Sequence, residues 1–140
     1  MRQSQTELGV YTWPEWPIQD EVRRKKDLGP AIALYQRALA LDPGNVSANR
    51  RLGQIELSLG QYEAALNHLE MAHAAEPGNQ TTRELLGEAY LANGRLAEGR
   101  ALWAMVSNEQ GQLDNRVWWY DHIGEKERAK WMQQAATGAP

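Results

Sequence analysis

The feature that most constrains this chain is a spacing of 34 residues between similar segments. Ala38–Asn45 recurs as Ala72–Asn79, so that Pro43 and Pro77 are 34 residues apart. The same offset relates further pairs: Leu52 and Leu86, Gly53 and Gly87, Gly60 and Gly94, and Ala65 and Gly99. A period of about 20 to 50 residues is typical of chains built from stacked copies of one supersecondary unit. The chain is therefore predicted to be a repeat array.

Each unit reads as a pair of helices. Gly60 and Gly94 interrupt strongly helical sequence and suit the left-handed residue that closes a helix before a tight turn. Asp42–Asn45 and Glu76–Asn79 are turn sequences whose final Asn is placed to cap the next helix. The apolar residues at helical spacing that we expect to be buried are Leu52, Tyr62, Leu66, Leu69, Leu86, Tyr90, Leu96, Leu102 and Trp103. The small residues Gly53 and Gly87 indicate a close crossing of the two helices.

This pattern resembles the tetratricopeptide repeat (TPR), a helix–turn–helix unit with small residues and a proline at fixed positions. The match runs across residues 46–79 and 80–113, and the second half of an earlier repeat covers residues 31–45. The sequence departs from the family at Asn49 and Arg83, where the family has Trp. The resemblance implies an all-α fold, an antiparallel helix-hairpin superhelix (TPR-like α-solenoid) of about three to four repeats with an atypical C-terminal capping hairpin.

We expect one domain over residues 1–140. Its parts are a Trp/Pro-rich lead-in (1–14), a degenerate first repeat (15–45), a second repeat (46–79), a third repeat (80–113), a shortened capping repeat (114–136) and a tail (137–140). The opening helix of the first repeat is expected from Glu15 to Lys26, with Asp27–Pro30 ending it. In the capping repeat, Asp114–Arg116 can cap a helix. Gly124 lies four residues from the position that the repeat register predicts, which indicates that the first helix of this repeat has lost one turn.

The sequence predicts no catalytic residue, no cofactor and no metal site, and we expect that the protein is not an enzyme. The chain has no cysteine, which excludes disulfides and thiolate metal sites. His68 and His73 are five positions apart, so a helix does not bring them onto one face. Neither a Gly-x-Ser-x-Gly elbow nor a phosphate-binding glycine loop occurs. The remaining histidine, His122, has no cysteine to activate.

Charge and hydropathy restrict the partners. The net charge of −3 argues against nucleic acid, which normally requires a basic surface. The one basic run, Arg23–Lys26, is flanked by acidic residues and is typical of a solvated helix face. No stretch approaches the roughly 20 apolar residues that span a bilayer, so we expect no membrane insertion by this segment. Met1–Pro17 lacks the apolar region of a signal peptide. A cytoplasmic location and an extracytoplasmic part of a membrane-associated protein both remain open.

The TPR resemblance implies that the protein is a scaffold or adaptor whose concave groove binds a peptide or helix of a partner protein. The residues at the family's groove positions are Ser47, Arg50, Gln54, Leu57, Thr81, Glu84, Glu88 and Leu91. Arg50 lacks the Asn and Lys partners of a carboxylate clamp, and Glu84 and Glu88 would repel a carboxylate. We therefore expect a ligand with a basic or neutral-polar segment, and Leu57 and Leu91 as the apolar floor of the groove.

Six tryptophans cluster mainly at the two ends of the chain. Together with Glu7-Leu8-Gly9, the segments Trp13-Pro14 and Val117–Tyr120 resemble the C-terminal TPR extension of bacterial O-antigen ligase/polymerase-type membrane proteins. That resemblance implies an alternative function, an accessory domain that contacts glycans or assembly partners of a cell-envelope polysaccharide enzyme. The tryptophans otherwise suit a capping role at the ends of the array, or a homodimer formed through these ends.

Overall fold

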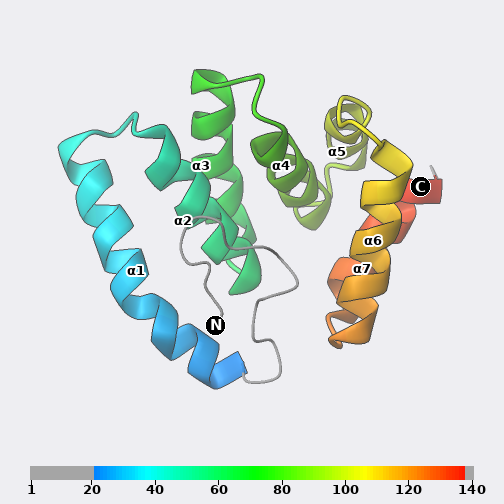
Figure 1. Cartoon of the computed structure of the whole chain (residues 1–140), viewed down its shortest axis with the longest axis horizontal. Helices are drawn as coiled ribbons and strands as arrows, with labels where there is room; N and C mark the ends of the chain where they lie inside the picture. Colours follow the sequence, from blue (N-terminus) through cyan, green and yellow to red (C-terminus); the bar gives the residue numbers. More distant parts are fainter. Residues whose placement is uncertain (1–20, 138–140) are drawn as a thin grey trace.

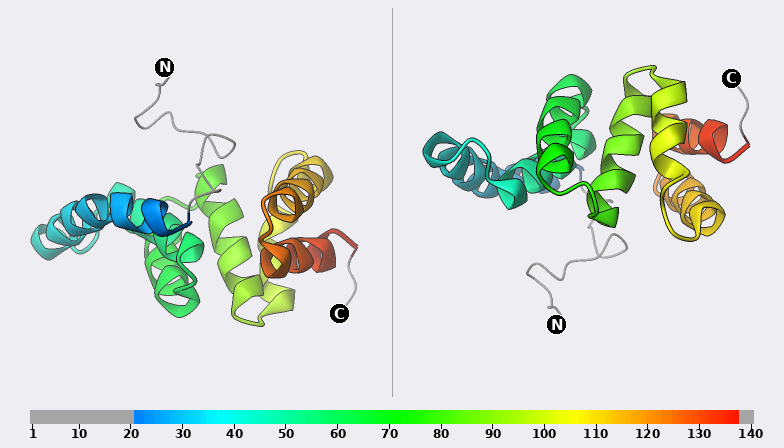
Figure 2. Two further views of the ribbon diagram at one scale, coloured as in Figure 1. Left: turned by 90° about the horizontal axis from the view of Figure 1, so that it is seen from below. Right: turned by 90° about the horizontal axis from the view of Figure 1, so that it is seen from above.

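Seven helices and no strand make up residues 21–137, which the computed structural model describes, with side chains from Leu28 onward. The helices are α1 (Glu21–Leu41), α2 (Val46–Ser58), α3 (Tyr62–Ala75), α4 (Gln80–Ala92), α5 (Leu96–Trp103), α6 (Glu109–His122) and α7 (Lys126–Thr137). Successive helices form hairpins that stand side by side, from α1 at one end to α6 and α7 at the other (Figures 1 and 2). This confirms the predicted all-α array. The lead-in at 1–14 and residues 138–140 lie outside the described residues.

The local turn signals have the predicted geometry. The Oδ1 atoms of Asn45 and Asn79 each accept a hydrogen bond at 2.9 Å from a backbone N–H three residues on, in the first turns of α2 and α4. Gly60 and Gly94 have φ angles of +81° and +78°, in the left-handed region that favours glycine. Gly124 repeats this conformation with φ +85° before α7. Helix capping and helix closure therefore follow from short-range sequence.

Small residues let the helices of each hairpin cross closely. A Cβ atom added to Gly53 would lie 2.5 Å from Cγ of Leu69, and one added to Gly87 would lie 2.6 Å from Cδ1 of Trp103. Two apolar clusters fill the space around these crossings, one centred on α2–α5 and one on the last hairpin. The predicted stripe is confirmed: its Leu and Trp residues are buried, apart from Leu96, which is partly buried together with Tyr62 and Tyr90.

Replacing Gly99 with alanine is expected to lower the free energy of unfolding by about 1–3 kcal/mol, as overpacked cores do. The new Cβ would lie 2.9 Å from the backbone carbonyl oxygen of Gly87, which cannot move without shifting α4. This strain outweighs the better helix propensity of alanine, worth about 1 kcal/mol. Urea unfolding of Gly99→Ala, with the exposed neighbour Arg100→Ala as the control, measures the effect. Equal midpoints for the two variants would contradict the close crossing.

The first helix differs from the prediction. α1 runs without a break from Glu21 to Leu41, so Asp27–Pro30 does not end a helix, and that expectation is wrong. A residue before proline is normally pushed out of the helical region because its Cβ meets the proline ring. Gly29 has no Cβ, which removes that clash and allows Pro30 inside the helix. Residues 15–20 of the expected opening helix lie outside the described residues.

The shortening of the array lies in a different helix from the one predicted. α5 has only 8 residues, whereas α3 has 14 and α6 also has 14. The lost turn therefore belongs to the second helix of the third repeat, and the expectation that the capping repeat has a short first helix is wrong. α6 begins at Glu109, so Asp114–Arg116 lies inside a helix. The left-handed residue before α6 is Asn108, with φ 55°.

Gly111 lies in the first turn of α6 and has a packing role there. A Cβ atom added there would lie 2.5 Å from Nδ2 of Asn108, so glycine leaves room for the Asn108 side chain.

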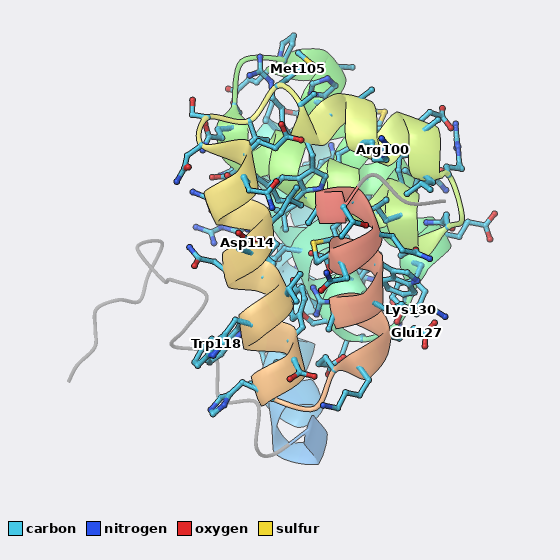
Figure 3. All side chains as sticks on the ribbon, turned by 90° about the vertical axis from the view of Figure 1, so that its right-hand side faces the viewer. Arg100, Met105, Asp114, Trp118, Glu127 and Lys130 are labelled. Carbon is cyan, nitrogen blue, oxygen red and sulfur yellow. The ribbon has the colours of Figure 1, made fainter. Side chains whose placement is uncertain are left out.

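The last hairpin packs differently from the others. Between the earlier hairpins, the second helix of one packs on the first helix of the next, as α1 does on α2 and α3 on α4. At the C-terminal end, α7 packs on both α4 and α5, while α6 makes few contacts with α5. Trp119 and Trp131 are partly buried against this hairpin's cluster, whereas Trp118 projects from α6 and is 63% exposed (Figure 3). The C-terminal hairpin is thus an atypical cap.

Within residues 21–137, no helix combines the length and apolar character that crossing a membrane requires.

Candidate functional site

The eight residues expected in the groove differ in how much of each side chain is exposed to solvent. Ser47 and Thr81 are exposed, Arg50, Gln54 and Glu84 are partly buried, and Leu57, Glu88 and Leu91 are buried. Leu57 and Leu91 are only 1% and 4% exposed and belong to the two apolar clusters. The expectation that they form an apolar floor of an open groove is wrong, because their positions on α2 and α4 face neighbouring helices of the array.

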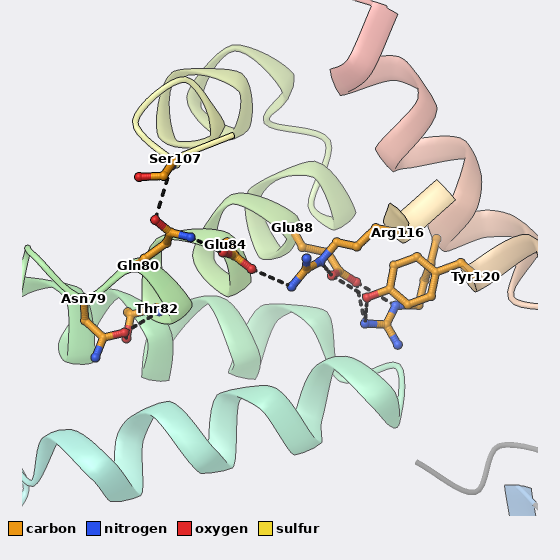
Figure 4. A network of polar contacts seen from close by, with 9 residues as sticks. Asn79, Gln80, Thr82, Glu84, Glu88, Ser107, Arg116 and Tyr120 are labelled. Carbon is orange, nitrogen blue, oxygen red and sulfur yellow. Dashed lines mark hydrogen bonds and ion pairs between the residues drawn. The ribbon is translucent and has the colours of Figure 1, made fainter. Parts of the chain in front are cut away.

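Glu88 is the centre of a buried polar network on α4. Its side chain is fully buried, and Nε of Arg128 donates a hydrogen bond to its Oε2 at 2.6 Å. The hydroxyl of Tyr120 donates to the other carboxylate oxygen at 2.7 Å and accepts from Nη2 of Arg128 at 2.7 Å (Figure 4). One α4 carboxylate thus joins both helices of the C-terminal hairpin.

Glu84, one turn before Glu88, extends the network toward the start of α4. Its carboxylate forms an ion pair with Arg116 of α6, with 3.0 Å between Nη2 and Oε1. It also accepts a hydrogen bond at 3.0 Å from Nε2 of Gln80, whose side-chain oxygen accepts from the backbone N–H of Ser107 at 3.2 Å. The guanidinium of Arg116 lies 5.1 Å from the ring centre of the buried Trp103 on α5. The chain of contacts runs along one face of α4 and ties it to α6, to α7 and to the segment between α5 and α6 (Figure 4).

The protonation states in this network suit its hydrogen bonds. Burial raises the pKa of the Tyr120 hydroxyl, so it stays protonated and donates to Glu88. Burial by itself lowers the pKa of Arg128, but the Glu88 carboxylate more than offsets this, and the pKa of Arg128 is raised. Arg128 is therefore a buried cation paired with a buried anion, the arrangement in which each charge depends on the other.

The network changes which groove charges are available to a partner. Glu84 and Glu88 are engaged by Arg116 and Arg128 of the protein itself, so the repulsion of an acidic ligand expected from these carboxylates does not operate. Arg50, partly buried on α2, keeps its positive charge on the predicted groove side. Arg50 is thus the only charged residue at the predicted groove positions of α2, and the predicted groove positions Glu84 and Glu88 of α4 are covered by the C-terminal hairpin.

Sequence reasoning missed the partners of Glu88. Arg128 lies in the charged run Glu125–Arg128, which is typical of a solvated helix face, but its side chain is buried and only 4% exposed. The available signal was a lone carboxylate, Glu88, in the run Leu85-Leu86-Gly87-Glu88-Ala89, which is otherwise apolar. A charge in such a run requires a partner, but nothing in the sequence indicates that the partner lies 40 residues away.

The histidines do not form a metal site with other residues in the described part of the chain. No group of three or more His, Cys, Asp and Glu side chains that could hold a metal occurs among those residues. Nδ1 of His68 on α3 lies 2.7 Å from Oε1 of Glu56 on α2 and joins the two helices of the second hairpin. Burial raises the pKa of Glu56, and the bond to His68 opposes that shift. The ring of His122 stacks on Trp118.

Comparisons with known proteins agree with this architecture. The tetratricopeptide repeat family matches in two overlapping stretches, residues 23–72 and 56–118. Among solved structures, a point mutant of MamA has a TM-score of 0.56 and 23% sequence identity, over 94% of this chain and 82% of that one. The MamA MSR-1 C2 structure has a TM-score of 0.55 and 20% identity, over 94% and 83%. At these identities the likeness concerns the fold.

No curated protein matches the chain. The resemblance to O-antigen ligase-type extensions stays a prediction, since neither the family match nor the solved structures bear on it. The family match covers well over half of the chain and coincides with the hairpins α1 to α5 and much of α6. This chain belongs to the tetratricopeptide repeat family.

Proposed function

We propose that this protein is a binding scaffold that holds an extended peptide or a helix of a partner protein against the first helices of its repeats. The observation that carries the proposal is the repeat array itself. Stacked helical hairpins present a continuous face of first helices, and partner segments commonly lie on such a face. Within the described residues the array has no clustered metal ligands.

The accessible part of the proposed surface lies on α2 and at the start of α4. Ser47, Arg50, Gln54 and Thr81 retain exposed area there, whereas Glu84 and Glu88 are engaged by the C-terminal hairpin. Hydroxyl, amide and guanidinium groups can donate hydrogen bonds to a partner, and only Arg50 among the four carries charge. The ligand that fits best is an acidic or neutral-polar segment, whereas a basic or neutral-polar segment was expected from the sequence.

Selection of peptides from a random display library, followed by calorimetric titration, tests this proposal. We expect the selected peptides to carry Asp or Glu, and the substitution Arg50→Glu to weaken their binding by about tenfold or more, because truncating or reversing one partner of a charge pair costs on the order of 1.4 kcal/mol or more. The matched control is Arg100→Glu, which reverses an exposed arginine on α5, outside the proposed surface. Peptides that bind both variants equally, or a library that yields no binder, would contradict the proposed surface.

A further inference from the structure

The outer face of the C-terminal hairpin carries an open groove of about 710 Å³ between α6 and α7. Its floor includes Val117 and Ala129, and the exposed Trp118 stands at its side. In a longer array the next repeat would cover this face, because each repeat buries its apolar side against a neighbour. The described residues of this chain leave the groove uncovered.

Trp118 is a preformed anchor beside this groove. Its side chain is 63% exposed, yet its ring stacks on His122 with 4.9 Å between the ring centres and 7° between the planes. A tryptophan that is already oriented loses little conformational entropy when a partner covers it. Tryptophan is also among the residues most enriched at the energetic centres of protein interfaces. The exposed indole thus points to a protein partner for this face.

The charges around the groove are divided between the two helices. The α6 side carries the carboxylates Asp114 and Asp121, and the α7 side carries Lys126 and Lys130. Lys126 already pairs with Asp121, with 2.7 Å between Nζ and Oδ1. Asp114 accepts a hydrogen bond only from the neutral Gln110, and Lys130 has no hydrogen bond or ion pair among residues 28–137. One anion and one cation are therefore available, on opposite sides of the groove (Figure 3).

A twofold interface uses the same surface of both copies, so that surface has to be self-complementary. An acidic α6 side and a basic α7 side satisfy this condition when α6 of each copy lies along α7 of the other. We propose that a second copy of this chain docks on the outer face of the C-terminal hairpin, with Trp118 of each copy against the groove of the other and Asp114 of each copy facing Lys130 of the other. This interface is separate from the peptide-binding surface on α2.

Sedimentation equilibrium over a wide concentration range tests the proposal. We expect the mass of the chain to rise from 15.8 kDa toward twice that value as its concentration increases. The substitutions Asp114→Lys and Lys130→Glu each place like charges across the interface, and each is expected to weaken dimerisation by about tenfold. The double variant Asp114→Lys, Lys130→Glu restores opposite charges in every pair, and it is expected to recover the wild-type dissociation constant.

Two further variants separate this interface from general changes in charge or folding. Glu127→Lys reverses an exposed charge on α7 outside the groove lining and is expected to leave dimerisation unchanged. Trp118→Ala is expected to weaken it, with circular dichroism confirming that the helices remain. A chain that stays monomeric at all concentrations would overturn the proposal, as would a dimer that ignores both charge reversals.

The alternative that this face binds glycans is tested by titrating the monomeric chain with neutral oligosaccharides such as cellohexaose and maltohexaose. Binding is followed by tryptophan fluorescence. A saturable change that Trp118→Ala abolishes, without any dimer, would assign this face to saccharides and overturn the proposal. Because the Arg50 surface plays no part in any of these measurements, failure here leaves the proposed scaffold function standing, and the reverse also holds.

Discussion

Replacing Glu88 with alanine is expected to lower the free energy of unfolding by about 3–5 kcal/mol, the usual cost of breaking a buried ion pair by removing one partner. The variant leaves the guanidinium of Arg128 buried without its carboxylate and removes the acceptor of the Tyr120 hydroxyl. A small domain has only about 5–15 kcal/mol of stability in total. Urea unfolding followed by circular dichroism measures the loss directly.

The matched control for this prediction is Glu98→Ala. Glu98 pairs with Arg95 at 2.6 Å, the same distance as between Glu88 and Arg128, but both groups are exposed to solvent. Water screens an exposed pair, so we expect little change in stability from this variant. If both variants lost the same stability, the role assigned to burial would be wrong.

A double variant, Glu88→Ala with Arg128→Ala, shows how much of the lost stability comes from leaving a buried charge unpaired and how much from lost packing. We expect it to be more stable than the sum of the two single variants predicts, because it leaves no unpaired buried charge. Strict additivity would mean that the two residues do not act as a pair.

Replacing Trp103 with alanine is expected to lower the free energy of unfolding by about 3–5 kcal/mol, the range for removing a large buried aromatic side chain. Trp103 is fully buried, and its ring packs where α4 and α5 cross, so alanine leaves a cavity between them. The variant also removes the ring that lies under the Arg116 guanidinium. Chemical denaturation monitored at the far-ultraviolet helix signal measures the change.

Trp118→Ala is the control for Trp103→Ala. It removes the same side chain from a site that is 63% exposed, and we expect little effect on the stability of the monomer.

The contact between Trp103 and Gly87 offers a further check. Gly87→Ala is expected to destabilise the wild-type protein, because its Cβ would overlap the indole, but to cost little in the Trp103→Ala variant, where that space is empty. An equal cost of Gly87→Ala in both backgrounds would contradict this packing.

The Glu88 network also links the fold to the proposed function. The carboxylates at two groove positions of α4 stabilise the C-terminal hairpin instead of facing a partner. The same ion pairs that close the array therefore restrict the proposed binding surface to α2 and the first turn of α4. We therefore expect the loss of Glu88 to weaken the packing of the C-terminal hairpin on α4 and to leave Arg50 on α2 in place.

The sequence by itself determined the repeat, the family and the helix ends at Asn45, Gly60, Asn79 and Gly94. These depend on residues a few positions apart: an Asn side chain that caps the turn after it, or a glycine that takes a positive φ angle after a helix, as Asn45 and Gly60 do. Such signals act within one or two turns, so a single sequence displays them. The prediction that a helix ends at Gly29-Pro30 was wrong for a reason that is also local. Gly29 has no Cβ to clash with the ring of Pro30, so the helix continues through both residues.

Only the tertiary structure decided which of the predicted groove positions are exposed and how the last hairpin packs. Glu88 and Arg128 are 40 residues apart, and the sequence does not indicate that they pair, because their contact forms only when α7 packs on α4. Burial of a charge depends on long-range partners, which here come from the packing of α7 on α4. Local sequence carries no information on such long-range packing, so only the tertiary structure shows which residues of the proposed binding surface are exposed.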